Sequence, residues 1–159
     1  MQMLIACVGK LKENYWRDAA AEYQKRLSRF AQLEIKEVRD QPAPERLSPA
    51  QREQVLLLEG AGLLAGISPR DFVVALCLEG QAHASEAFAS ELNGWLTQAQ
   101  GRIVFVIGGS LGLSAEVLRR ADAKISLSKM TFPHQLARVL LLEQLYRAFK
   151  INANESYHK

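Results

Sequence analysis

Cysteine is scarce in this chain of 159 residues, where only Cys7 and Cys77 occur, each inside an apolar run typical of a strand. Two thiols in such runs predict buried cysteines rather than a disulfide or a metal pair, and they favour a reducing, cytoplasmic compartment. No apolar run approaches the roughly 20 residues that span a bilayer. The N-terminus lacks a basic segment followed by an apolar core, so we expect neither a secretion signal nor a membrane partner.

The sequence also lacks the signatures of several kinds of chemistry. Its three histidines, His83, His134 and His158, are scattered, and no Cys–His cluster has metal-ligand spacing, so we expect no metal. No G-x-S-x-G nucleophile elbow occurs. The G-K-[ST] of a Walker loop and the G-x-G-x-x-G dinucleotide fingerprint are missing as well. Covalent and metal-assisted hydrolysis are therefore disfavoured.

Apolar runs alternate with segments of helical periodicity along the whole chain. We expect strands at residues 3–8, 33–38, 72–78, 102–107 and 124–127, and helices at 13–30, 49–64, 85–99, 115–120 and 133–150. Asn14 and Ser114 are the expected N-caps of two helices, and Pro49 suits a first helical position. The central strands are apolar on both faces, which predicts one α/β domain over residues 1–159, with a mainly parallel sheet and helices on both faces.

Two loops in the last third of the chain, residues 103–159, each follow a predicted strand. The first is Gly108-Gly109-Ser110-Leu111-Gly112, in which glycine would let the backbone approach a ligand closely. A tight turn is the alternative explanation of these glycines. If a ligand binds here, a side chain at position 108 should crowd it and weaken its binding.

The second loop, residues 128–134, leaves the last strand and enters the last helix. Met130 and Phe132 would form an apolar lid over a ring while main-chain amides hydrogen-bond to the edge of the ring; an ordinary strand–helix connection is the alternative. Leu76 ends an earlier strand, and it contacts a ligand only if its backbone faces an adenine-like group. Ligands of open parallel sheets bind outside the carboxyl ends of the strands, so these segments predict one site.

The last helix is apolar on nearly every side, through Leu136, Val139, Leu140, Leu141, Leu142, Leu145, Tyr146 and Phe149. Such a helix is buried on more than one side. A subunit interface would supply the second buried surface, so we predict a homodimer; a fully buried core helix in a monomer is the alternative.

Positive charge is concentrated in residues 119–159, which hold eight basic and three acidic residues. This segment has a net charge of +5, whereas the remaining residues sum to −2 and the whole chain to +3. Such a distribution fits a phosphate-binding surface, and it fits an ordinary solvated surface equally well.

Five segments together carry a resemblance to a known family: IACVGKLKENYW, LCLEG, VFVIGGSLGL, SLSKMTFPHQLARVLLLEQLYRAFKI and the closing SYHK. Over essentially its whole length the chain resembles the SPOUT class of α/β methyltransferases, in particular those that modify bacterial large-subunit ribosomal RNA. The resemblance implies a C-terminal trefoil knot, a homodimer, and S-adenosylmethionine bound within about residues 103–159. It also implies N3-methylpseudouridine in helix 69 of 23S rRNA as the product, made on the assembled ribosome.

The resemblance also implies where the cofactor would be held. Carried over by position, its contacts fall on Leu76 and Gly108 and on the loop after the last strand, namely Leu127, Ser128, Lys129, Met130, Thr131 and Phe132. In the family, the tail of the partner subunit completes the site.

For the acceptor base, the hypothesis rests on three polar residues near the C-terminus. His158 or its polar neighbours would accept the imide proton or stabilise the anion, Arg138 would hold a phosphate or the imide oxygen, and Tyr157 would stack on or orient the flipped base. His134 is a weaker candidate, because a histidine at a helix start can be purely structural.

The rival functions are a related enzyme acting on tRNA, an enzyme with a small-molecule substrate, and a non-catalytic ribosome-binding or assembly factor.

Overall fold

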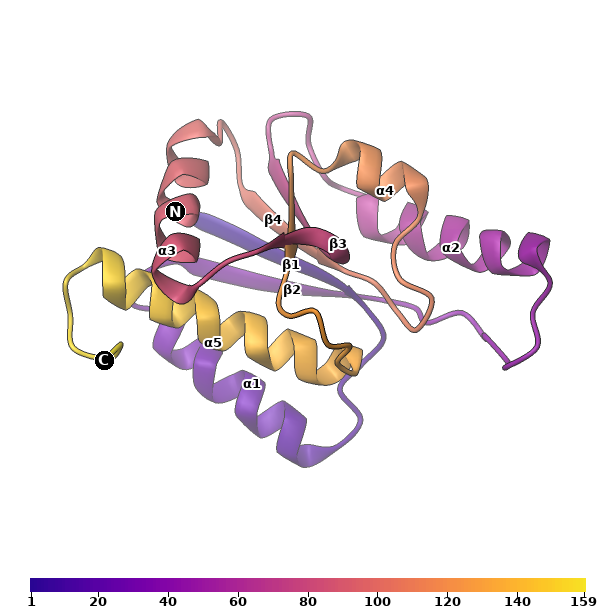
Figure 1. Ribbon diagram of the computed structural model, residues 1–159, viewed down its shortest axis with the longest axis horizontal. Coiled ribbons are helices and arrows are strands. Elements are labelled where there is room, and N and C mark those ends of the chain that lie inside the picture. The colour runs from indigo at the N-terminus through magenta and orange to yellow at the C-terminus, as the bar shows by residue number, and fades with distance from the viewer.

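A five-stranded sheet forms the centre of the computed structural model, which describes residues 1–159. All its strands are parallel, and they lie in the order β2-β1-β4-β3-β5 (Figure 1). The strands are β1 (Gln2–Val8), β2 (Gln32–Val38), β3 (Phe72–Ala82), β4 (Ile103–Ile107) and β5 (Ala123–Ser126). The predicted α/β class with a parallel sheet is confirmed, and the trefoil knot stays a prediction.

Five helices cover the two faces of the sheet. They are α1 (Asn14–Leu27), α2 (Pro49–Leu64), α3 (Ser85–Gln98), α4 (Ala115–Arg120) and α5 (His134–Asn152). Helices α1, α3 and α5 lie on one face, and α2 and α4 lie on the other (Figure 1). None of the helices combines the length and the apolar character that a membrane crossing needs.

The structure confirms the predicted cap at Ser114 and the first helical position of Pro49, and it contradicts the predicted cap at Asn14. Ser48 and Ser114 each accept a hydrogen bond from a backbone N–H in the first turn of α2 and α4. The predicted cap at Asn14 is wrong, because Asn14 is already helical and Glu13 occupies the cap position without a side-chain bond. The side-chain oxygen of Asn14 instead accepts a hydrogen bond from Arg17, one turn further on.

The strands divide the core into two apolar clusters, one on each face of the sheet. Ile5 and Phe105 belong to the larger cluster, under α1, α3 and α5, whereas Leu4 and Val104 belong to the smaller one, under α2 and α4. This alternation is the two-residue period of a strand. Because both faces are covered, β1 and β4 are continuous apolar runs, as the sequence indicated.

Strand β3 extends beyond the predicted end at Leu78 because it pairs with β5 twice. Leu76 lies opposite Ile125, the pairing is then interrupted, and it resumes with Gln81 opposite the same isoleucine. Gly80 lies in the interruption, where any Cβ would overlap the backbone of Ile125. A glycine at this position therefore lets β3 pass close to β5 just beyond the carboxyl edge of the sheet.

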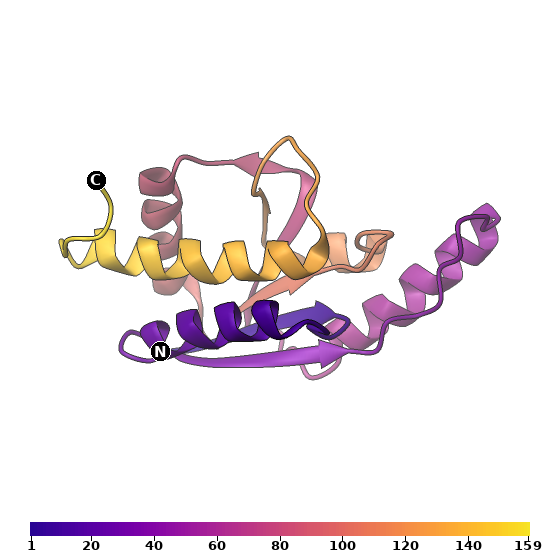
Figure 2. The same cartoon turned by 90° about the horizontal axis from the view of Figure 1, so that it is seen from below.

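Helix α5 packs beside α1 and α3 (Figure 2). Leu141, Leu142 and Leu145 are fully buried, whereas Leu136 and Val139 are only half-buried. The C-terminus lies beyond the end of α5 that is remote from the β5–α5 loop, in both views. The β5–α5 loop and the C-terminal tail of one chain thus lie at opposite ends of α5.

Asp71, at the start of β3, is a buried carboxylate that joins two strands. It accepts hydrogen bonds from the amides of Ser68 and Arg102, and the Arg102 guanidinium pairs with it at 2.9 Å. Burial alone would raise the pKa of Asp71, but these hydrogen bonds and the Arg102 charge outweigh it, so the pKa lies below its usual range.

We predict that Asp71→Ala lowers the free energy of unfolding by about 2–4 kcal/mol, because three donors lose a buried partner. A carboxyl whose pKa is depressed by folding stabilises the protein above its unfolded pKa. The difference in free energy of unfolding between the variant and the wild type should therefore be largest above about pH 4 and shrink as the pH falls below it. Urea unfolding across this range measures it, with the exposed Asp18→Ala as control. A pH-independent difference would contradict this role of the carboxylate.

Candidate active site

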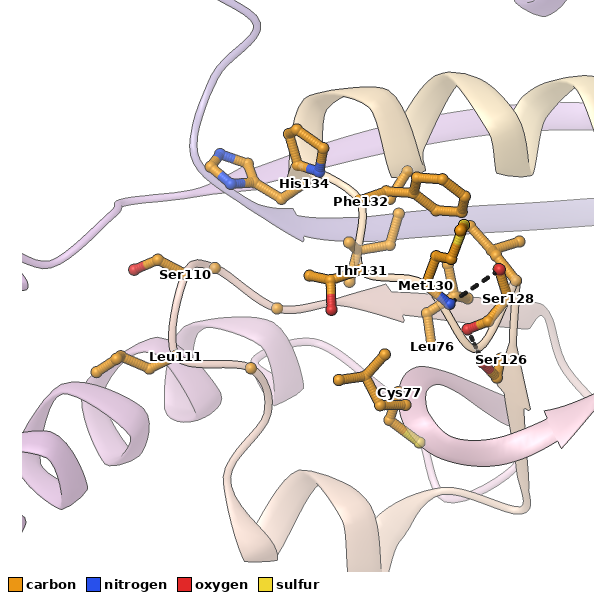
Figure 3. Close-up of a pocket in the computed structure, with 18 residues that line it drawn as sticks. Leu76, Cys77, Ser110, Leu111, Ser126, Ser128, Met130, Thr131, Phe132 and His134 are labelled. Carbon is orange, nitrogen blue, oxygen red and sulfur yellow. Dashed lines mark hydrogen bonds between the residues drawn. The ribbon is translucent and has the colours of Figure 1, made fainter.

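A cavity of about 620 Å³ opens where the carboxyl ends of β3, β4 and β5 meet. Its walls come from the end of β3, from the glycine loop after β4, and from the β5–α5 loop with the first turn of α5 (Figure 3). The position agrees with the sequence prediction of a single site at this edge. The volume lies within the range of about 300–1,000 Å³ that is usual for small-molecule sites.

Seven of the eight predicted cofactor residues line this cavity: Leu76, Gly108, Leu127, Ser128, Met130, Thr131 and Phe132. Lys129 is exposed and is not part of the wall. The sequence reasoning missed Cys77 and Leu78, which also line the cavity. Their position directly after Leu76, at a strand end, was the available signal.

The glycine loop is a closed turn. The amide of Gly112 donates to the carbonyl of Gly109 at 3.1 Å, and Gly112 has a positive φ of 85°, which glycine adopts without strain. At Gly108, an added Cβ would overlap the backbone of Gly112. The conformation therefore needs glycine for its own closure, and this closure leaves backbone rather than side chain facing the cavity at Gly108.

The β5–α5 loop is fixed by two short-range bonds (Figure 3). Ser126 donates its hydroxyl to the Ser128 carbonyl at 2.8 Å, and the Ser128 hydroxyl accepts from the Met130 amide at 3.0 Å. Met130 leaves 74% of its surface exposed, and Phe132 is half-buried. An exposed methionine on a fixed loop is available to cover a ligand, which is what the predicted lid requires.

Aspartate, glutamate, lysine and arginine side chains are absent from the wall of the cavity, and its ionisable side chains are Cys77 and His134. Burial raises the pKa of the Cys77 thiol, with a further contribution from Glu79, so this thiol stays neutral. Burial lowers the pKa of His134, which is the first residue of α5. The cavity is thus mostly apolar, with hydroxyl groups, backbone groups and one imidazole.

Arg138 lies outside this cavity. It is only 3% exposed, and its guanidinium pairs with Glu37 at 2.8 Å and donates to the Gly9 carbonyl at 2.9 Å. It borders a separate hollow of about 480 Å³, together with Lys10 and Arg17. Within one chain, Arg138 thus joins α5 to β2 and to the end of β1.

Tyr157 and His158 also lie away from the cavity of their own chain. The Tyr157 hydroxyl donates to Glu143 at 3.1 Å, and the Arg147 guanidinium lies 4.6 Å from the centre of the Tyr157 ring. Burial, followed by the Glu143 hydrogen bond, raises the pKa of Tyr157 to about 12. At 1.5 Å per residue, Arg147 lies about 20 Å along α5 from His134.

The two nitrogens of His158 both have partners. Arg147 lies 3.2 Å from Nδ1, and Glu86 on α3 lies 2.8 Å from Nε2. Since a guanidinium only donates and a carboxylate only accepts, Nδ1 accepts from Arg147 and Nε2–H donates to Glu86. The tail is therefore held against α3 and α5 by side chains of its own chain.

The family model for predicted SPOUT methyltransferases matches residues 1–158. "Ribosomal RNA large subunit methyltransferase H" of Lactobacillus delbrueckii subsp. bulgaricus and that of Carboxydothermus hydrogenoformans are each 53% identical to this chain, over 100% of both sequences. The counterpart from Lactobacillus johnsonii is 52% identical over the same full length.

Two solved structures share the fold. A probable methylase family protein from Haemophilus influenzae matches with a TM-score of 0.52 and 16% identity, over 99% of this chain and 70% of that one. A probable rRNA-methyltransferase from Porphyromonas gingivalis matches with a TM-score of 0.54 and 10% identity, over 95% and 69%.

The cavity fits the methyl donor that the resemblance implies. An adenosyl group needs apolar contact on its ring faces and hydrogen-bonding groups at its edges. Leu76 and Leu127 in the wall would offer apolar contact, and the serine hydroxyls and the loop backbone would offer donors and acceptors. Gly108 adds backbone groups to the wall, and its side-chain direction is closed off by the backbone of Gly112.

We predict that Gly108→Ala weakens S-adenosylmethionine binding by about tenfold or more, which is at least 1.4 kcal/mol. The added methyl group would push Gly112 out of the turn, so the free energy of unfolding should also fall by about 1–3 kcal/mol. Calorimetric titration and thermal unfolding measure the two effects. Gly94→Ala, in open space on α3, is the matched control and should leave binding unchanged. Unchanged affinity in Gly108→Ala would remove this loop from the site.

Proposed function

The chain belongs to the SPOUT methyltransferase family, and from this membership we propose that it methylates N3 of a pseudouridine in helix 69 of 23S ribosomal RNA. S-adenosylmethionine is the methyl donor, and the assembled ribosome is the substrate. One observation carries the proposal: relatives that match this chain from end to end at 53% identity are named for methylation of large-subunit ribosomal RNA.

When bound, S-adenosylmethionine supplies an electrophilic methyl group on a sulfonium, which is transferred by direct displacement. The task of the protein is then to orient the two reactants in line and to keep water out. Leu76, the glycine loop and the wall residues of the β5–α5 loop bind and orient the donor. Met130 closes over the cavity and excludes water.

We further propose that the enzyme is a homodimer in which the tail of one subunit reaches the cavity of the other. The half-buried residues Leu136 and Val139 on α5 offer the apolar surface for this contact. In such a dimer, Tyr157 and His158 complete the partner's site: Tyr157 orients the flipped base, and His158 contacts it through the tail that Glu86 and Arg147 hold.

Phosphate contacts come from basic residues that have no acidic partner. Within residues 119–159, Arg120, Arg138, Arg147 and Lys150 form ion pairs. The remaining four, which are exposed, are Arg119, Lys124, Lys129 and Lys159. Arg138 is buried and paired with Glu37, so a phosphate could reach it only from the hollow that it borders with Lys10 and Arg17. Because exposed cations bind phosphate with release of counterions, ribosome binding should weaken with salt.

The substrate is tested by methyl transfer from labelled S-adenosylmethionine to ribosomes, free large-subunit RNA and tRNA, all from cells that lack this enzyme. We expect label on assembled ribosomes alone, at N3 of a pseudouridine. Label on tRNA would show that tRNA is the substrate, while the methyl transfer itself would stand as proposed. The absence of label on all three, with a folded protein, would favour a non-catalytic ribosome-binding factor.

The shared site is tested with two inactive chains, Gly108→Val and a chain that ends at Ser156. We predict that mixed dimers of the two recover activity, because one of their two sites combines an intact cavity with an intact tail. Each variant assembled with itself is the control. If the tail served its own chain, the mixed dimers would stay inactive, and a monomer in light scattering would contradict the arrangement outright.

A further inference from the structure

We propose that His134 is the group that accepts the N3 proton of the acceptor base. This inference rests on the proposed function and names a residue for one of its steps. The imide nitrogen carries a hydrogen, and it must lose that hydrogen before its electron pair can attack a methyl group. A general base within hydrogen-bond reach of the reacting atom is therefore needed.

The composition of the cavity wall leaves one candidate in the chain that holds the donor. No aspartate, glutamate, lysine or arginine lines the cavity, and the Cys77 thiol stays protonated. Serine and threonine hydroxyls are far too weak as bases at neutral pH. His134 is the only side chain in the wall that carries a basic nitrogen, and burial lowers its pKa.

The tail histidine is less suited to this step. In its observed position, His158 accepts a hydrogen bond from Arg147 through its one basic nitrogen, so that the lone pair is already engaged. Its other nitrogen donates to Glu86. These bonds suit a residue that fixes the tail in place, and the bond from Arg147 would have to break before Nδ1 could accept the proton of the base.

His134 has the opposite surroundings. It lies at the edge of the cavity, on the side of Ser110 (Figure 3), and its ring packs beside Gly9, where only a hydrogen fills the side-chain position. Burial lowers its pKa, Arg138 and Lys12 lower it further, and Asp40 opposes them. No hydrogen bond contributes to this shift. The imidazole is therefore neutral at physiological pH, and its basic nitrogen is free.

The step balances without any further reagent. The N3–H bond breaks and the proton moves to the ring nitrogen of His134, while the electron pair on N3 forms the new bond to the methyl carbon. The methyl–sulfur bond breaks and its electron pair stays on sulfur, so the positive charge moves from sulfur to the imidazolium. The imidazolium then returns its proton to water.

The experiment compares His134→Asn and His134→Ala with Gln135→Ala, the matched control on the next residue of α5. Single-turnover methyl transfer to ribosomes is measured from pH 6 to about pH 9.5, and S-adenosylmethionine affinity is measured by calorimetry. We expect both His134 variants to lose about 10²–10⁴-fold in rate at pH 7, with donor affinity within about twofold of the wild type. Gln135→Ala should keep the wild-type rate.

The pH profile separates a base from a structural histidine. The wild-type rate should level off above the pKa of His134, whereas the rate of the Asn variant should keep rising by about tenfold per pH unit as the imide ionises unaided. Nuclear magnetic resonance of the ring nitrogens gives a readout without turnover, and it should show a neutral imidazole at pH 7.

Three results would overturn the assignment while the wild type remains active on ribosomes: rates within about threefold of wild type, parallel pH profiles, or a loss of donor affinity as large as the loss of rate. An imidazole that is protonated at pH 7 would overturn it as well. A wild-type enzyme that labels no ribosomal RNA would instead remove the proposed function itself.

Discussion

Parallel pairing of β3 with both β4 and β5 is the constraint on which the site depends. In a parallel sheet, strands that are neighbours end at the same edge, so the loops that leave them must meet there. Strand β3 brings Leu76 and Cys77 to this edge, and the loops after β4 and β5 close over them from either side. Gly80 preserves the arrangement, because its missing side chain lets β3 run on against Ile125.

The cavity that results has little charge, and this suits the proposed chemistry. In the proposed step one positive charge moves from the sulfonium to the imidazole, so the reaction creates no new net charge that a low-dielectric wall would oppose. Charged groups instead lie outside the cavity, where they perform other tasks. Arg138 and Glu37 fasten α5 to the sheet, and Arg147 fastens the tail. A single uncharged imidazole in the wall is then enough to move the one proton of the reaction.

Local sequence patterns predicted the sheet and a ligand site at its carboxyl edge, because apolar periodicity and strand-end glycines act over a few residues; the cofactor and its contacts came from the family resemblance. They could not place Arg138, whose partner Glu37 is 101 residues away, or His158, whose partner Glu86 is 72 residues away. Both are assigned to the acceptor base in the sequence analysis because of their chemistry and their expected placement beside the cofactor loop. Long-range pairs of this kind leave no local signal, which is also why His134, a helix-start histidine in sequence, could be weighed only once the cavity was known.

The most direct test of the account is where the methyl donor contacts the protein. S-adenosylmethionine with a ¹³C-labelled methyl group, bound to the protein, reports its neighbours through nuclear Overhauser effects from its methyl and adenine protons. The account predicts contacts to the side chains of Leu76, Met130 and Phe132 at the carboxyl edge of β3. Contacts instead to Lys10 and Arg17, in the hollow that α1 and β2 form beside Arg138, would contradict it, since the donor would then lie at another site.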